Sequence, residues 1–255
     1  MRKNSMRLSP LWLLLGMSAC AAPSRLHLSA PSRPQLSNAL TMRVADAALA
    51  GGAPAMALRV TREILAKHPR NVQAMVGEGD ALYAMGRGDA AAGSYRRALA
   101  IRPHDIQARL GLGRTRLRTD AAGAEAMFQA VVAFDSANAA AWNDLGIARD
   151  LQGRHAAAQE AYERALGVDP DMIAAQVNLG FSLAIAGHGS RAVGILRPLA
   201  ESSAATPRIR QDLAVALAVD GQPGEASEVL RADLSQTQAA DALSVYQRFR
   251  PTRID

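Results

Sequence analysis

The sequence is poor in several kinds of residue, and each shortage excludes a class of protein. Its 255 residues include one cysteine, Cys20, which excludes an internal disulfide and a cysteine-based zinc cluster. Aromatic residues make up only 4% of the chain, whereas β-strands are rich in aromatic and β-branched residues. The composition is therefore not that of a sheet protein or of a small disulfide-stapled one.

The charge is also modest once its distribution is considered. The net charge is +6, but residues 1–19 carry Arg2, Lys3 and Arg7 and no acidic residue, and the first acid in the chain is Asp46. Without those three basic residues, 26 basic and 23 acidic residues remain, a net charge of +3. Nucleic-acid binding needs a concentrated basic face, so we expect no nucleic-acid partner.

Alanine is the residue present in excess. It accounts for 54 of the 255 residues, and it has the highest helix propensity of all residues. A core built from alanine and leucine predicts an all-α protein.

The N-terminus has the three parts of an export signal. Residues 1–9 are basic and polar, residues 11–17 form the apolar run LWLLLGM, and the small residues Ser18 and Ala19 follow. The apolar run is far shorter than the ~20 residues that a membrane-spanning helix needs. We expect residues 1–19 to be a signal peptide that begins at Met1 or at Met6.

The end of this segment, Met-Ser-Ala-Cys at residues 17–20, resembles a bacterial lipobox. The resemblance implies cleavage before Cys20, which would then carry covalent diacylglycerol and palmitate; no other cofactor is expected. Ala21 follows without an aspartate, which in this class implies sorting to the outer membrane of a Gram-negative-type bacterium, on its periplasmic face. Two alternatives stay open: Ala19 and Ala21 could form an ordinary signal-peptidase site, and Cys20 could be incidental.

Residues 20–37 are expected to be the lipidated cysteine and a flexible linker. The stretch after Cys20 contains Pro23, Pro31 and Pro34, four serines and no acid. Such a composition cannot bury a core and stays extended. At roughly 3 Å per residue, the linker could hold the folded part up to about 50 Å from a bilayer.

The rest of the chain repeats with a period of 34 residues. Small residues, alanines, an aromatic residue or leucine, and a proline recur in fixed register, as in Gly146, Ala158, Tyr162, Ala165 and Pro170. This pattern resembles the tetratricopeptide repeat, which implies a right-handed α-solenoid of helix pairs. We assign six units, with a C-terminal capping helix over 239–250: 38–71, 72–105, 106–138, 139–172, 173–206 and 207–240.

The turns agree with this assignment. Gly86, Gly153, Gly187 and Gly221 fall between the two helices of their units, where a C-terminal glycine is favoured. Prolines at 69, 103 and 170 are expected to end the second helices. The third unit is one residue short between Arg118 and Ala124.

The resemblance also implies a binding groove. In this family the first helix of each unit lines the concave face, and the matching positions here make an apolar groove with scattered polar groups, which suits a peptide. The candidate contacts are Tyr83, Leu110, Arg114, Arg118, Asn143, Ile147, Asp150, Val177 and Phe181.

Two of these candidates carry open alternatives. Arg114 and Arg118 are four residues apart, so they would share a helix face and could receive an acidic partner residue, or they could belong to a solvated face. Phe181 could contact a peptide or could pack between neighbouring first helices.

The sequence offers no recognisable catalytic arrangement. The five histidines are scattered, no H-E-x-x-H motif occurs, and acids such as Asp120, Asp135 and Asp220 lie at expected helix ends, where capping is the ordinary role. We therefore expect no enzyme activity, no catalytic residues and no metal site.

A finer resemblance concerns residues 143–170 and 196–227. These segments, the second containing L-R-P-L-A and A-T-P-R-I-R-Q-D-L-A, are similar to the TadD-like tetratricopeptide lipoproteins of tight-adherence (Flp/Tad) pilus machines. The resemblance implies a pilotin-like adaptor or scaffold, anchored to the membrane by its lipid, whose protein partners are the pilus secretin or other Tad components. The alternatives are a scaffold for another envelope complex, such as polysaccharide export, and a repeat partner of a periplasmic hydrolase.

Overall fold

The protein is described by a computed structural model that covers residues 33–246, with side chains from residue 39. This part of the chain is helical throughout and contains no strand. Its helices are α1 (Arg33–Ala50), α2 (Pro54–Lys67), α3 (Val72–Ala84), α4 (Gly88–Ile101), α5 (Ile106–Arg116), α6 (Ala121–Phe134), α7 (Ala139–Asp150), α8 (His155–Val168), α9 (Ile173–Ile185), α10 (Gly189–Glu201), α11 (Pro207–Val219), α12 (Pro223–Leu230) and α13 (Gln236–Tyr246).

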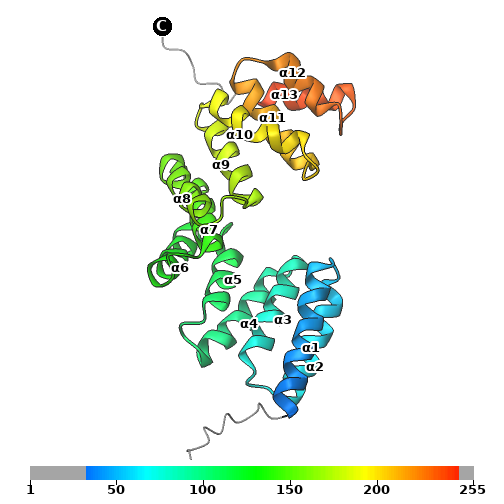
Figure 1. Ribbon diagram of the computed structural model, residues 1–255, viewed down its shortest axis with the longest axis vertical. Coiled ribbons are helices and arrows are strands. Elements are labelled where there is room, and N and C mark those ends of the chain that lie inside the picture. Colours follow the sequence, from blue (N-terminus) through cyan, green and yellow to red (C-terminus); the bar gives the residue numbers. More distant parts are fainter. Residues whose placement is uncertain (1–32, 247–255) are drawn as a thin grey trace, which may run out of the picture.

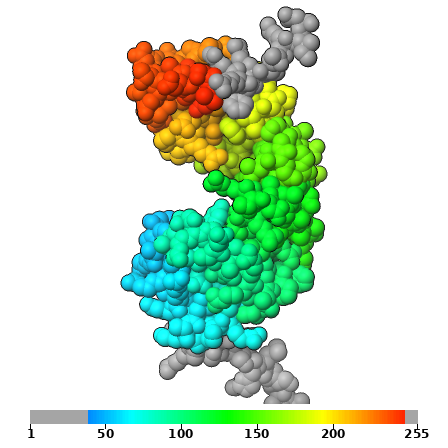
Figure 2. Space-filling view, turned by 180° about the vertical axis from the view of Figure 1, so that it is seen from behind, coloured from blue at the N-terminus to red at the C-terminus, as the bar shows by residue number. Residues whose placement is uncertain are grey.

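The helices form six consecutive pairs that stack into a curved solenoid, and α13 packs against α11 and α12. Figure 1 shows the arc, with α1 and α2 at one end and α12 and α13 at the other. The second helices α6 and α8 lie on its outer side. Figure 2 shows the hollow that the arc encloses between the N-terminal and C-terminal units. The expected all-α solenoid of helix pairs is confirmed.

Some boundaries differ from the sequence-based ones. Helix α1 begins at Arg33, inside the segment expected to be linker, because Pro34 is tolerated in the first turn of a helix. The last unit ends earlier than expected, since α12 has 8 residues. The C-terminal helix begins at Gln236 rather than 239. The signal segment 1–19, Cys20 and residues 247–250 lie outside the described residues.

Glycine and proline punctuate the repeats as expected. Gly86, Gly153, Gly187 and Gly221 have φ angles of 72°, 71°, 85° and 86°, in the left-handed region that favours glycine. Helices α2, α4 and α8 end two residues before their prolines. Asp120 caps α6 by accepting a 2.8 Å hydrogen bond from the backbone N–H of Gly123.

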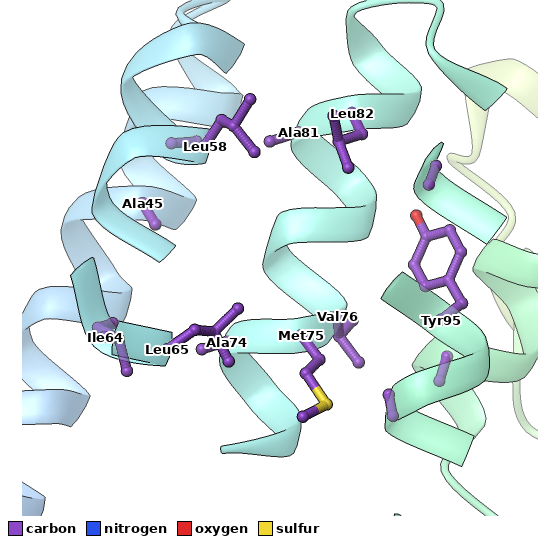
Figure 3. Close-up of a cluster of buried hydrophobic side chains, with 14 of the residues drawn as sticks. Ala45, Leu58, Ile64, Leu65, Ala74, Met75, Val76, Ala81, Leu82 and Tyr95 are labelled. Carbon is purple, nitrogen blue, oxygen red and sulfur yellow. The ribbon is translucent and has the colours of Figure 1, made fainter. Parts of the chain in front are cut away.

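The core explains the alanine content. Figure 3 shows Leu58 and Leu65 of α2 directed toward α3, where Ala81 and Ala74 leave room for them. Both alanines are fully buried, as is the Tyr95 ring of α4. Small residues on one helix therefore receive large side chains from the next, which lets the helices approach closely.

A buried carboxylate joins the third and fourth pairs. Glu125 of α6 accepts 3.1 Å hydrogen bonds from Arg149 Nε and Gln152 Nε2 and is also paired with Arg154. Burial raises the pKa of Glu125, but these donors outweigh that effect, and the net shift is downward. The negative charge of Glu125 is thus bound at the contact between two units, and these interactions help to fix the position of one unit relative to the other.

Candidate functional site

A concavity lies on the inner face of the solenoid, between α7, α9 and the start of α11. Its volume is about 670 Å³. We call it the α7–α9 pocket, and it is lined by Asn143, Ile147, Asp150, Leu151, Tyr162, Ala174, Val177, Asn178, Phe181, Ile185 and Arg208. The pocket therefore takes its walls from three successive units rather than from one.

The middle of the pocket is apolar. Ile147 of α7 faces Val177 and Phe181 of α9 across it, with Leu151 and Ile185 at the C-terminal ends of these helices. Val177 is almost fully buried, whereas Leu151 is 55% exposed. The floor is thus preformed by packing, and the rim leaves apolar surface open to a partner.

Asp150 lies at one end of this apolar row, and three side chains contact its carboxylate. Tyr162 Oη donates to Asp150 Oδ2 over 2.9 Å, and Ser182 Oγ donates to Oδ1 over 2.8 Å. His155 Nδ1 is 2.8 Å from the same Oδ1. Burial, and then the nearby Asp150 carboxylate, raise the pKa of Tyr162, so its hydroxyl stays protonated and donates. Asp150 is therefore fixed in place, with its negative charge facing the pocket.

The other end of the row carries amides and an arginine. Asn178 Nδ2 donates to Asn143 Oδ1 over 2.9 Å, and Arg208 Nη2 donates to Asn178 Oδ1 over 3.4 Å. Arg208 Nε is 3.6 Å from Asp212 Oδ2, an atom that is buried without a hydrogen-bond partner. Burial raises the pKa of Asp212 to about 6. This end can donate and accept hydrogen bonds to a peptide backbone.

The sequence-based candidates divide between this pocket and other places. Five of them line it together, as expected from their shared repeat positions: Asn143, Ile147, Asp150, Val177 and Phe181. Phe181 is half-buried. It packs against the core of the last three units and also lines the pocket, so the two roles considered for it are compatible.

Leu110 was expected in the groove, and that expectation is wrong. Its side chain is 2% exposed and belongs to the core with Phe128 and Leu145. Residues at the same, fifth position of three other units are buried as well: Val76, Asn143 and Val177. Tyr83 is 44% exposed on α3 but does not line the α7–α9 pocket.

Arg114 and Arg118 do not form a joint binding site for an acidic residue of a partner. Arg114 Nε donates to Asp144 Oδ2 of the next unit over 2.6 Å. Arg118 lies in the turn after α5, which ends at Arg116. The missing residue in this unit shortens the helix, so the two arginines do not share a helical face.

Leu151 and Ile185 stand at concave-face positions of their units, and four further lining residues were missed from the sequence: Tyr162, Ala174, Asn178 and Arg208. Ala174 and Arg208 stand at the second position of their units, one of the positions of the tetratricopeptide pattern that face the concave side, so a signal for both existed. Tyr162 belongs to the repeat signature, and the role of its hydroxyl depends on Asp150, twelve residues away and on another helix.

Two further observations concern ions and membranes. Among the described side chains, no group of three or more histidines, cysteines or acids could hold a metal ion. Over the described part of the chain, none of the helices combines the length and the apolar character needed to cross a bilayer.

Comparison with known proteins identifies the repeats. Residues 43–106 and 139–172 match tetratricopeptide-repeat families. No curated protein sequence gives a significant match. The chain therefore carries tetratricopeptide repeats, and its fold is their solenoid.

Solved structures with this fold include bacterial tetratricopeptide proteins. The thermophilic protein TTC0263 of Thermus thermophilus is 25% identical with a TM-score of 0.58, over 70% of this chain and 98% of that one. MamA of Desulfovibrio magneticus is 25% identical with a TM-score of 0.53, over 64% and 93%. PilW, a type IV pilus biogenesis factor, is 18% identical with a TM-score of 0.70, over 80% and 98%, a likeness of fold alone.

Proposed function

We propose that this tetratricopeptide-repeat solenoid is a membrane-anchored adaptor that binds a peptide segment of an envelope protein in the α7–α9 pocket. The observation that carries the proposal is the pocket itself: an apolar row of Ile147, Val177 and Phe181 between a fixed carboxylate, Asp150, and an amide edge. An apolar groove with a few oriented polar groups suits a peptide, because burial supplies affinity and the polar groups set register.

The anchor rests on the N-terminal sequence. Cys20 stands where a lipobox requires its cysteine, and the linker that follows is long enough to hold the solenoid away from the bilayer. Two acyl chains are sufficient for stable anchoring. The protein would then present its concave face in the periplasm while remaining attached to the outer membrane.

The system served is proposed to be a Flp/Tad pilus machine. The support is the likeness of residues 143–170 and 196–227 to TadD-like lipoproteins. The two segments together contain most of α7 and all of α8 and α11, so they include walls of the α7–α9 pocket. The partner would be the pilus secretin or another assembly component.

The binding role is tested by crosslinking and affinity purification of the full-length protein from cell envelopes. Leu151→Glu and Phe181→Glu place a charge on the apolar row and should each reduce partner recovery by about tenfold. Leu151 is already exposed, so its substitution leaves the fold intact even if that of Phe181 does not. The matched control is Phe134→Glu on α6, outside the pocket, where the side chain is 77% exposed.

Equal recovery with Leu151→Glu and with Phe134→Glu would rule out the pocket as the binding site. The pilus role has its own test: deletion of the gene should lower the amount of secretin multimers and surface pili. Unchanged amounts of both would contradict a role in Tad assembly and leave peptide binding to another envelope complex.

A further inference from the structure

The first helix exposes a face that every other first helix buries. In the register of the repeat, Leu40 and Val44 are the third and seventh residues of their unit, and they are 60% and 46% exposed. The equivalent residues of the other five units are all buried: Ala74, Ala108, Ala141, Ala175 and Ile209 at the third position, and Glu78, Leu112, Leu145, Leu179 and Leu213 at the seventh.

The reason for this difference is the place of α1 in the stack. In the second unit the equivalent face packs on the preceding unit, where Gly77 lies against Thr61 and Met42. No helix pair precedes α1 among the described residues, and Figure 1 shows it at the end of the arc. The opposite end is covered by α13. Terminal repeats of solenoids normally need a polar outer face for solubility, whereas α1 exposes the apolar side chains of Leu40 and Val44.

The exposed face is a continuous helical stripe. Leu40, Val44 and Ala47 follow one another on α1 at spacings of four and three residues, the pattern that presents one side of a helix to a partner helix. Gly51, in the turn directly after the helix, continues the spacing. The side chains in the first half of the stripe are large, and the residues in its second half are small. Such a stripe is complementary to the same stripe of a second copy that runs in the opposite direction.

We propose that α1 pairs antiparallel with α1 of a second copy of this chain, forming a twofold-symmetric dimer. With the axis between residues 44 and 45, Leu40 lies opposite the gap between Ala47 and Gly51 of the second copy, and Val44 lies beside the axis. Leu40 then meets small residues, the two Val44 side chains meet each other at the axis, and the contact is isologous, as in most homodimers.

The charges favour the same register. Residues 43 and 46 are equidistant from this axis, so the long side chain of Arg43 lies level with Asp46 of the second copy. Both residues are exposed, and neither has an ion pair within residues 39–246. The symmetry forms this contact twice, which gives the antiparallel arrangement a charge complementarity that a parallel one lacks.

The test is sedimentation equilibrium of the full-length protein in detergent, over concentrations up to about 100 µM. The expected result is a monomer–dimer equilibrium, in which Val44→Glu raises the dissociation constant by about tenfold or more, since it puts a charge at the dimer axis. Ala126→Glu, on the exposed side of α6, is the matched control and should leave the constant unchanged.

A charge exchange tests the register. Arg43→Glu should weaken the dimer several-fold, and Arg43→Glu combined with Asp46→Arg should restore it to within about threefold. A chain that stays monomeric at all concentrations overturns the proposal. So does a dimer indifferent to Val44→Glu, or a double variant as weak as the single one. A monomer whose melting temperature falls with Val44→Glu would mean that another part of the same chain covers the stripe, which also overturns it.

Discussion

Gly146 of α7 lies directly beneath the ring of Tyr162 of α8: a Cβ atom at residue 146 would be 2.6 Å from Cδ1 of that ring. The same relationship joins the first and second helices of three other units. A Cβ atom would be 2.5 Å from Tyr95 at Gly79, 2.5 Å from Phe128 at Gly113, and 2.6 Å from Leu196 at Gly180. This one contact sets the distance between the two helices of a unit.

Gly146→Ala should therefore destabilise the protein. The added methyl group cannot be accommodated without moving the Tyr162 ring, and overpacking of this kind costs about 1–3 kcal/mol. Denaturant unfolding followed by circular dichroism measures it. Gly167→Ala is the matched control: Gly167 lies on α8 with open space around it, so this change should stabilise by about 0.5–1 kcal/mol. Equal effects of the two substitutions would contradict the steric explanation.

Loss of the ion pair between Arg114 and Asp144 should lower the stability of the protein, because Asp144 is buried. Burial raises the pKa of Asp144 and the Arg114 guanidinium partly offsets that rise, so Arg114→Leu leaves a poorly compensated buried carboxylate. We expect a loss of about 2–4 kcal/mol in the free energy of unfolding. Arg114→Leu combined with Asp144→Leu should recover most of it. A double variant less stable than Arg114→Leu would mean that the pair itself is strongly stabilising.

Asp212 predicts a specific pH dependence. Its folded-state pKa of about 6 exceeds the ordinary value of 3.8, so ionisation opposes folding above pH 6, and this cost disappears as the pH falls toward 4. Asp212→Asn should thus raise the free energy of unfolding by up to about 3 kcal/mol at pH 8, and by roughly half as much at pH 5. Urea titrations at the two pH values measure this, and a gain independent of pH would show that Asp212 is not the titrating group.

Lipidation gives a direct prediction for Cys20. Labelled palmitate should enter the wild-type protein in cells and should not enter Cys20→Ser, because the thiol is the acylated group that the lipobox resemblance implies. Ala22→Ser, two residues further along, should keep the label. Labelling of Cys20→Ser would refute the anchor.

Much of the architecture was predictable because repeats encode it locally. Gly153 has a left-handed backbone that other residues rarely adopt, and Pro170 cannot continue a helix. Spacing along the chain therefore located the helix pairs and the turns. The same register brought Asn143, Ile147 and Phe181 to one pocket, since equivalent positions of stacked units face the same way.

The shared helix face considered for Arg114 and Arg118 is absent because the third unit departs from the register. The missing residue of the third unit ends α5 at Arg116, which separates Arg114 from Arg118. The Arg114 side chain is paired with Asp144, which lies thirty residues further along the chain. No local pattern could indicate that contact, because it depends on how two units rotate against each other.

The sequence by itself determined the helical class, the repeat length and the punctuation of the turns, because these follow from the conformational limits of glycine, proline and alanine. The tertiary structure decided which side chains are available. Leu112 is buried, while Val44 is exposed, although both are apolar first-helix residues at the seventh position of their units. The difference is the position of their helices in the stack. A side chain is buried only where a neighbouring helix covers it, and only the assembled solenoid determines which helix faces have such a neighbour.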